Sequence, residues 1–182
     1  MSEYFDIVDQ EGNPTGETVE RTIAHEKGIW HRTSHVWLFR RKGDKLQVLL
    51  QKRTMTKDSF PGCFDISSAG HIPAGIGFVA SALRELEEEL GITADPDNLI
   101  FCGDRKIITD DVFHGKPFHD RQYSRVFLMW CDKEENHFTL QPEEIDSVKW
   151  LDFDVCLESV KNNAFPHCID VEELELLYKN II

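Results

Sequence analysis

The sequence predicts a mixed α/β domain in which helices cover a sheet. Three observations lead to this fold class. Short β-rich runs are joined by polar turns that contain glycine, two stretches have the apolar spacing of amphipathic helices, and the 182 residues suit one ordinary domain. No internal repeat or low-complexity linker interrupts the chain, so we expect one domain over residues 1–182.

The predicted strands pair mostly as hairpins. Residues 4–9 lead into a turn that contains glycine, and a return strand begins at Thr18, which predicts an N-terminal hairpin within residues 1–30. The β-rich runs 34–39 and 46–51 flank a polar turn and predict a second hairpin. Further strands are expected at residues 99–102, 123–130 and 148–151, and helices at residues 78–90 and 171–179.

Charge and cysteine usage exclude several classes of protein. The formal net charge of -13 argues against nucleic acid or a membrane surface as a partner. The chain start has neither a basic patch nor an apolar stretch, so we expect no targeting signal. The five cysteines are odd in number, are widely spaced and form no C-x-x-C pair, which predicts a reduced, cytoplasmic protein.

The helix expected at residues 78–90 carries three carboxylates close together. Glu85, Glu88 and Glu89 gather on a face turned away from the apolar stripe. That stripe, which predicts the buried face, consists of Val79, Leu83, Leu86 and Leu90. Like charges at this spacing repel unless cations hold them ionised, so the cluster indicates a divalent-metal site; a solvated acidic face is the alternative.

The flanks of this helix decide between the two interpretations. Residues 70–92 resemble the signature of the Nudix family, G-x5-E-x7-R-E-U-x-E-E-x-G-U, where U is apolar, and match eight of its nine specified positions. The matching residues are Gly70, Arg84, Glu85, Leu86, Glu88, Glu89, Gly91 and Ile92. In place of the first glutamate stands Ile76, which cannot bind metal.

The resemblance implies a Nudix-type α/β/α sandwich with a mixed sheet and an N-terminal hairpin extension. It implies hydrolysis of the pyrophosphate bond of a nucleoside diphosphate linked to another group, a small-molecule substrate. Glu85, Glu88 and Glu89 are the expected ligands of Mg²⁺ or Mn²⁺, one of them positioning or deprotonating the attacking water, and Arg84 orients a carboxylate. Ile76 leaves two alternatives: other acids substitute for the missing glutamate, or the domain binds nucleotides with weak activity.

A longer stretch, from His25 to His71, resembles the isopentenyl-diphosphate isomerases and their Nudix relatives. The residues that carry this resemblance are His25, His31, Trp37, Leu38, Phe39, Lys52, Arg53, Lys57, Phe60, Pro61, Gly62, Ser68, Ala69, Gly70 and His71. In the isomerases three histidines and two downstream glutamates bind a metal. The histidines match His25, His31 and His71, whereas the glutamates fall near Asp120 and Gln122, so this site is expected to be incomplete.

Ala69 argues against isomerase activity. The isomerases carry their catalytic cysteine immediately before the Gly-His pair, and a methyl group neither donates nor accepts the proton that double-bond migration requires. A hydrolase of the isomerase-like branch is therefore the preferred interpretation.

The same resemblance suggests how the substrate is held. Lys52, Arg53, Lys57 and His71 are the predicted substrate-binding residues, because this segment contacts the diphosphate in the isomerases and cations suit phosphate. Glu143 and Glu144 are candidates for a general base outside the box. The oligomeric state is left open, with a homodimer as one alternative.

Overall fold

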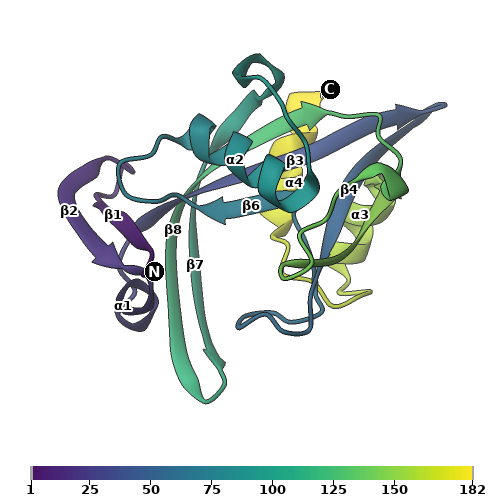
Figure 1. The fold of residues 1–182 in the computed structure, drawn as a ribbon. Helices are drawn as coiled ribbons and strands as arrows, with labels where there is room; N and C mark the ends of the chain where they lie inside the picture. Colours follow the sequence, from purple (N-terminus) through teal and green to yellow (C-terminus); the bar gives the residue numbers. More distant parts are fainter. Residues whose placement is uncertain (1, 182) are drawn as a thin grey trace.

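The computed structural model describes residues 2–181 and has three layers (Figure 1). A sheet forms the middle layer. Helix α2 (Phe78–Leu90) covers one face, and α3 (Phe153–Lys161) and α4 (Val171–Ile181) cover the other. This arrangement confirms the predicted α/β/α sandwich.

The central sheet is mixed. In the described part of the chain its strand order is β5-β4-β3-β8-β7, with β6 paired to β3 and β9 paired to β4; only β3 and β8 run parallel. The strands are β3 (His31–Lys42), β4 (Lys45–Arg53), β5 (Phe64–Asp65), β6 (Ser68–His71), β7 (Ile100–Phe113), β8 (Lys116–Trp130) and β9 (Ile145–Asp152). Because β3 pairs with β6 along its first half and with β4 along its second half, the sheet opens between β6 and β4.

Alternation along β3 separates two apolar cores. Trp37 and Phe39 pack toward α3 and α4, whereas Val36 and Leu38 pack toward α2. At the start of β3 the same alternation turns polar, and the face that carries Trp37 continues as His35, Thr33 and His31. The buried apolar layer thus gives way to a row of polar side chains at one end of the sheet.

A separate hairpin and a short helix cover this polar end. β1 (Tyr4–Val8) pairs with β2 (Pro14–Glu20), as predicted, and α1 (Arg21–Lys27) follows and lies beside β8. Phe5 is fully buried, and its ring stacks on those of His31 and His71 at centroid distances of 4.8 and 4.9 Å. The hairpin is therefore part of the wall of the polar region.

The hairpin also holds the loop before α2. The Asp6 carboxylate accepts hydrogen bonds from Gly75 N at 2.9 Å and from the Arg32 guanidinium at 2.7 Å, and Arg32 donates a second bond to Ile76 O at 2.9 Å. The Asp6 and Arg32 side chains are both largely buried. Ile76 is 40% exposed, so the residue in place of the box glutamate faces solvent.

Several elements differ from the sequence prediction. The strands expected at residues 99–102 and 123–130 are parts of much longer strands, β7 and β8, whose outer halves have too many charged residues to give an apolar signal. Helices α1 and α3 and the 3-10 turns η1 (Pro96–Asn98) and η2 (Glu135–His137) were not expected. In α3 the buried residues Phe153, Cys156 and Val160 follow helical spacing, a signal that was present but short.

We expect Asp6→Asn to lower the free energy of unfolding by about 2–4 kcal/mol, because it leaves the largely buried Arg32 guanidinium without its counter-charge. Urea unfolding measures this change, with Asp44→Asn in the exposed turn between β3 and β4 as the matched control. Equal stability of the two variants contradicts the anchoring role of Asp6.

Candidate active site

One large cavity of about 1320 Å³ lies at the polar end of the sheet. Its walls come from α1, the first half of β3, the segment between β4 and β6, the last turns of α2, the β7–β8 hairpin and the start of α4. Three carboxylates of α2 line it, and so do three members of a second group of metal-ligand side chains, whose fourth member, His31, is fully buried. The site is built from these two groups.

Helix α2 presents the predicted carboxylates to the cavity. The helix ends at Gly91, whose φ of 63° is the left-handed conformation that glycine adopts readily. Its buried side differs slightly from the predicted stripe: Ala82, Leu86 and Leu90 are fully buried, whereas Val79 is 37% exposed. Ala82, four residues before Leu86, is small and lets the helix approach the sheet. The three carboxylates of the helix line the cavity.

Gly70 makes room for the first of these carboxylates. A Cβ atom on Gly70 would lie 2.3 Å from Cδ of Glu85, so only glycine allows this side chain to pass. Arg84 forms an ion pair with Glu85, the contact through which it would orient this carboxylate. Burial raises the pKa of Glu85 above its ordinary value, and Arg84 opposes that shift.

Glu89 is the most deeply buried carboxyl of the helix. It is 6% exposed, and its Oε2 accepts a hydrogen bond from Ser68 Oγ at 2.7 Å. Burial raises the pKa of Glu89 to about 8, although the Ser68 bond opposes the shift. Glu88 is exposed and also lines the cavity. A protonated, buried carboxyl beside two other carboxyls gains most from a cation, which replaces its proton.

The second ligand group consists of His25, His31, His71 and Asp120. One ligand atom from each of the four lies within 4.8 Å of the others. Burial lowers the pKa of His25 to about 4 and that of His71 well below its ordinary value, so both rings are neutral at neutral pH. Although burial works in the opposite direction, His31, His25 and Gln122 keep the pKa of Asp120 below its ordinary value. Neutral imidazoles and an ionised carboxylate are the forms that bind a metal.

The orientation of His31 shows that this group fits a metal. Its Nδ1 donates to Ile29 O at 2.8 Å, so that in the neutral ring the lone pair of Nε2 points toward Asp120. Nε2 lies 3.3 Å from Asp120 Oδ1, yet both buried atoms lack a hydrogen-bond partner among the described residues. In the neutral ring these are two facing acceptors, which repel each other unless a proton or a metal cation lies between them.

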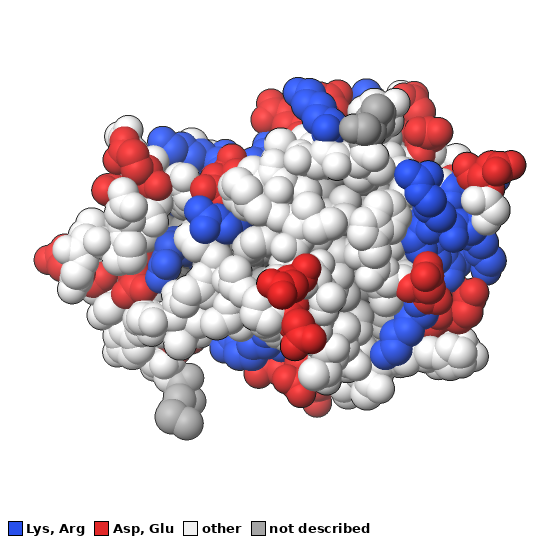
Figure 2. All heavy atoms as spheres, turned by 90° about the horizontal axis from the view of Figure 1, so that it is seen from above, with Lys and Arg blue, Asp and Glu red and all other residues white. Residues whose placement is uncertain are grey.

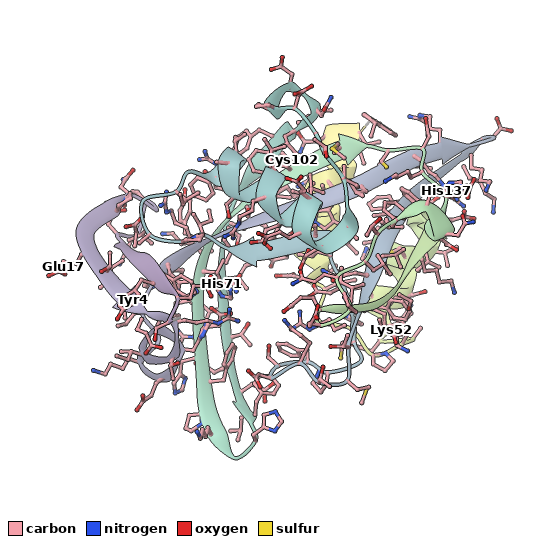
Figure 3. All side chains as sticks on the ribbon, viewed as in Figure 1. Tyr4, Glu17, Lys52, His71, Cys102 and His137 are labelled. Atoms are coloured by element: carbon pink, nitrogen blue, oxygen red, sulfur yellow. The ribbon has the colours of Figure 1, made fainter. Side chains whose placement is uncertain are left out.

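Of the cationic residues predicted to bind the diphosphate, two line the cavity and one does not. Arg53 lines the cavity and binds Asp65 at 3.1 Å, and Lys57 lines it as an ion pair with Glu144. Lys52, near the end of β4, is absent from the cavity wall, and its Nζ lies 3.7 Å from an Asp146 carboxylate oxygen on the surface. Figure 3 shows it well away from His71. Of the two candidate bases, Glu144 lines the cavity and Glu143 does not.

Sequence reasoning missed a buried pair in the same cavity wall. His35 on β3 and Glu173 on α4 contact each other and both line the cavity. The alternation His31, Thr33, His35 was a signal for the histidine, because these residues share one face of a strand. Nothing in the sequence pattern joins His35 to Glu173, which lies 138 positions later.

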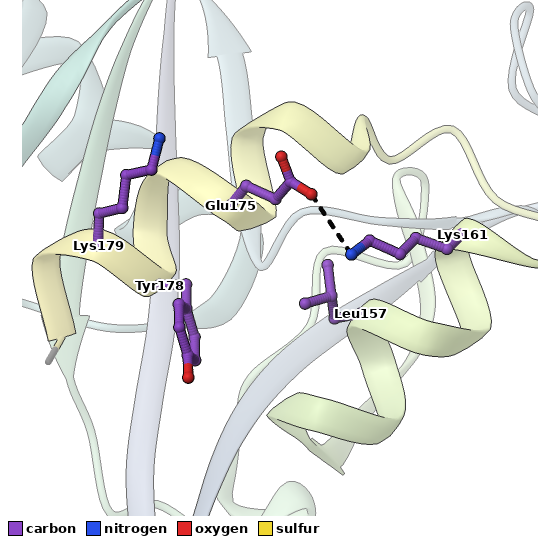
Figure 4. A pocket seen from close by; sticks show the side chains of 5 residues that line it. All are labelled: Leu157, Lys161, Glu175, Tyr178 and Lys179. Carbon is purple, nitrogen blue, oxygen red and sulfur yellow. Dashed lines mark ion pairs between the residues drawn. The ribbon is translucent and has the colours of Figure 1, made fainter.

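A smaller hollow of about 290 Å³ lies between α3 and α4 (Figure 4). Its polar contact is the ion pair between Lys161 and Glu175, at 3.3 Å. No group of metal-ligand side chains that includes these residues was found in the described chain. The large cavity is therefore the candidate active site.

On the face in Figure 2 most charged side chains lie along the rim, where acidic and basic groups are neighbours. The centre of this face is largely uncharged apart from a few acidic groups. None of the helices in residues 2–181 has the length and apolar character needed to cross a bilayer.

We expect the raised pKa of Glu89 to make the metal-free protein less stable as pH rises. The unfolded group ionises near 4.5 and the folded one at about 8, so stability falls between these values and levels off above. Glu89→Gln removes this dependence. With a chelator present, the variant's Tm should exceed that of the wild type by roughly 5 °C near pH 8.5 and match it near pH 4.5. Parallel Tm curves for the two proteins across this range would contradict the assignment.

Comparison with known proteins agrees with this geometry. The sequence model of the NUDIX domain matches residues 30–167. The chain is 38% identical over 152 residues to an uncharacterized Nudix hydrolase of Clostridium acetobutylicum, covering 84% of this chain and 71% of that protein. It is 40% identical over 156 residues to Nudix hydrolase 3 of Arabidopsis thaliana, covering 84% of this chain but 19% of that longer protein.

Further relatives indicate the branch and the fold. Isopentenyl-diphosphate Delta-isomerase 2 of Photorhabdus laumondii is 30% identical over 167 residues, covering 90% of this chain and 85% of that protein. The solved NUDIX domain of Shewanella oneidensis NrtR, complexed with ADP ribose, superposes with a TM-score of 0.61 at 16% identity, covering 83% of this chain and 88% of that chain. The chain therefore belongs to the Nudix hydrolase family, in the branch that also contains isopentenyl-diphosphate isomerases.

Proposed function

We propose that the protein is a metal-dependent pyrophosphohydrolase that cleaves the pyrophosphate bond of a nucleoside diphosphate linked to another group. The observation that carries this proposal is the convergence of three carboxylates of α2 on one large cavity. Burial raises the pKa values of two of them, Glu85 and Glu89, which is typical of carboxyl groups at a functional site. A cytoplasmic location agrees with five free cysteines in the described chain.

The two ligand groups suit different cations. Glu85, Glu88 and Glu89 offer oxygen atoms only, the preference of Mg²⁺ and Mn²⁺. The group of His25, His31, His71 and Asp120 offers three nitrogens and one oxygen, which suits a softer divalent cation such as Mn²⁺ or Zn²⁺. A bound divalent cation neutralises phosphate oxygens and lowers the pKa of a water molecule.

The residues of the chain prepare the site for such a substrate. Arg84 holds Glu85, Ser68 holds Glu89, and Ile29 O fixes the ring of His31. Arg53 and Lys57 bring positive charge to the cavity wall, and Lys57 pairs with Glu144, the candidate base that also lines the cavity. The role of Lys52 in diphosphate binding stays a prediction that its surface position does not favour.

The substrate class rests on the volume and lining of the cavity. A space of about 1320 Å³ exceeds the needs of a diphosphate alone and leaves room for a nucleoside and its linked group. Three aromatic rings line the cavity near the tip of the β7–β8 hairpin: Phe60, Phe113 and Phe118. The ring centroid of Phe113 lies 4.9 Å from that of Phe60 and 5.3 Å from that of Phe118. Apolar rings suit the base of such a substrate. ADP ribose, the ligand of the structural relative, is one compound of this class.

We expect hydrolysis to require a divalent cation and to depend on α2. Replacing Glu88 and Glu89 together by glutamine keeps volume and removes two charges, so kcat should fall by roughly 10²-fold or more. Phosphate release is measured over nucleotide sugars and dinucleotides with Mg²⁺ or Mn²⁺, and Glu87→Gln, on the exposed side of α2, is the matched control. Retention of full activity by the double variant rules out the assigned site. A folded wild-type protein without metal-dependent activity on any of these substrates favours the nucleotide-binding alternative.

Isomerisation of isopentenyl diphosphate is the second candidate function, favoured by the relatives of that name. Ala69 speaks against it, because it stands immediately before Gly70 and His71, where the isomerases carry their catalytic cysteine, and its methyl group cannot transfer a proton. In deuterated water we expect no enzyme-dependent incorporation of deuterium into the allylic product. Incorporation that follows protein concentration, and that is lost in Glu89→Gln, would replace the hydrolase proposal.

A further inference from the structure

A buried histidine and glutamate lie in the cavity wall without belonging to either ligand group. His35 Nδ1 lies 2.9 and 3.1 Å from the two carboxylate oxygens of Glu173. Glu173 is 1% exposed and also accepts hydrogen bonds from Trp37 Nε1 at 2.7 Å and from Arg105 at 3.3 Å. Trp37 and Arg105 hold the Glu173 carboxylate in place, and the carboxylate in turn holds the imidazole ring of His35 in one orientation, with Nδ1 as the donor.

The other ring nitrogen of His35 is left for a ligand. The contact found for Nε2 in the described chain is a 3.5 Å approach to Thr33 Oγ1, at the limit of a hydrogen bond. That hydroxyl already binds Ser124 Oγ at 2.6 Å. On β6 the residue opposite His35 is Ala69, whose side chain is a methyl group and leaves space on this face.

The ring of His35 lines the same cavity as both ligand groups. The three carboxylates of α2 are part of that lining, and so are His25, His71 and Asp120 of the second group. On the face of β3 that carries His35, Thr33 contacts Gln122, whose amide donates to Asp120 Oδ2 at 2.6 Å. A diphosphate bound to metal ions in this cavity therefore lies in the space that His35 also lines.

The charge of the ring suits a phosphate oxygen. Burial alone disfavours the imidazolium, yet Glu173 raises the pKa of His35 above its ordinary value. The other charged or titratable groups near the ring are Asp65, Arg105 and His71. A charged N–H bond to phosphate is shorter and stronger than a neutral one.

We propose that His35 is a substrate-contacting residue, whose Nε2–H donates a hydrogen bond to a phosphate oxygen of the diphosphate, and that Glu173 is its positioning residue. The proposal rests on the proposed function, because it requires a diphosphate in the cavity. It also explains how this chain uses the space beside Ala69, where the isomerases have their cysteine.

Two substitutions of His35 separate contact with substrate from support of the fold. His35→Asn places an amide nitrogen near the position of Nδ1, so it keeps a donor to Glu173 but removes the group that faces the cavity. His35→Gln instead places its amide near the position of Nε2. The probe is methylenediphosphonate, which is not hydrolysed, and its binding in the presence of Mn²⁺ is measured by titration calorimetry. His137→Asn, an exposed histidine on η2, is the matched control (Figure 3).

We expect His35→Asn to raise the Kd of the probe about 10-fold or more with little change in Tm, and His35→Gln to retain more of the affinity. If His35→Asn does not fold, Glu173→Gln decides, because weaker probe binding supports the positioning role and unchanged binding overturns it. A folded His35→Asn protein that binds the probe as the wild type does overturns the inference and leaves the proposed function intact. A wild-type protein that does not bind the probe with Mn²⁺ overturns both.

Discussion

Burial of ligand atoms without their counter-charge is the constraint on which this structure depends. His31 Nε2 and Asp120 Oδ1 face each other at 3.3 Å, both buried and both without a hydrogen-bond partner in the described chain. Glu89 is similarly held beside Glu85 with a pKa of about 8. Such groups cost stability in the metal-free protein, so their positions have to be enforced by the rest of the fold.

The apolar layers and the N-terminal hairpin supply that enforcement. Leu86 and Leu90 fix α2 on the sheet, so its carboxylates cannot turn away from the cavity. Phe5 stacks on two histidine rings, and Asp6 ties the loop before α2 to Arg32. The hairpin thus supports both ligand groups at once, which gives a physical reason for an extension that precedes the matched residues 30–167.

Local pattern was enough to predict much of this site. The carboxylates of α2 follow from helical spacing and from a signature of nine positions, and the N-terminal hairpin from its turn chemistry. The inner wall was not predictable in the same way. Glu173 contacts His35 only because α4 packs against the sheet. Lys52 does not line the cavity, whereas Arg53 does, because neighbouring residues of a strand point to opposite faces. Contacts between distant segments depend on packing, which periodicity alone does not encode.

The central claim is that two separate ligand groups in one cavity each hold a divalent cation. Anomalous diffraction from crystals soaked in Mn²⁺ tests it most directly, because manganese suits both donor sets. The account predicts one anomalous peak among His25, His31, His71 and Asp120, and at least one beside the carboxylates of α2. A fully soaked crystal with no peak at either group would contradict it.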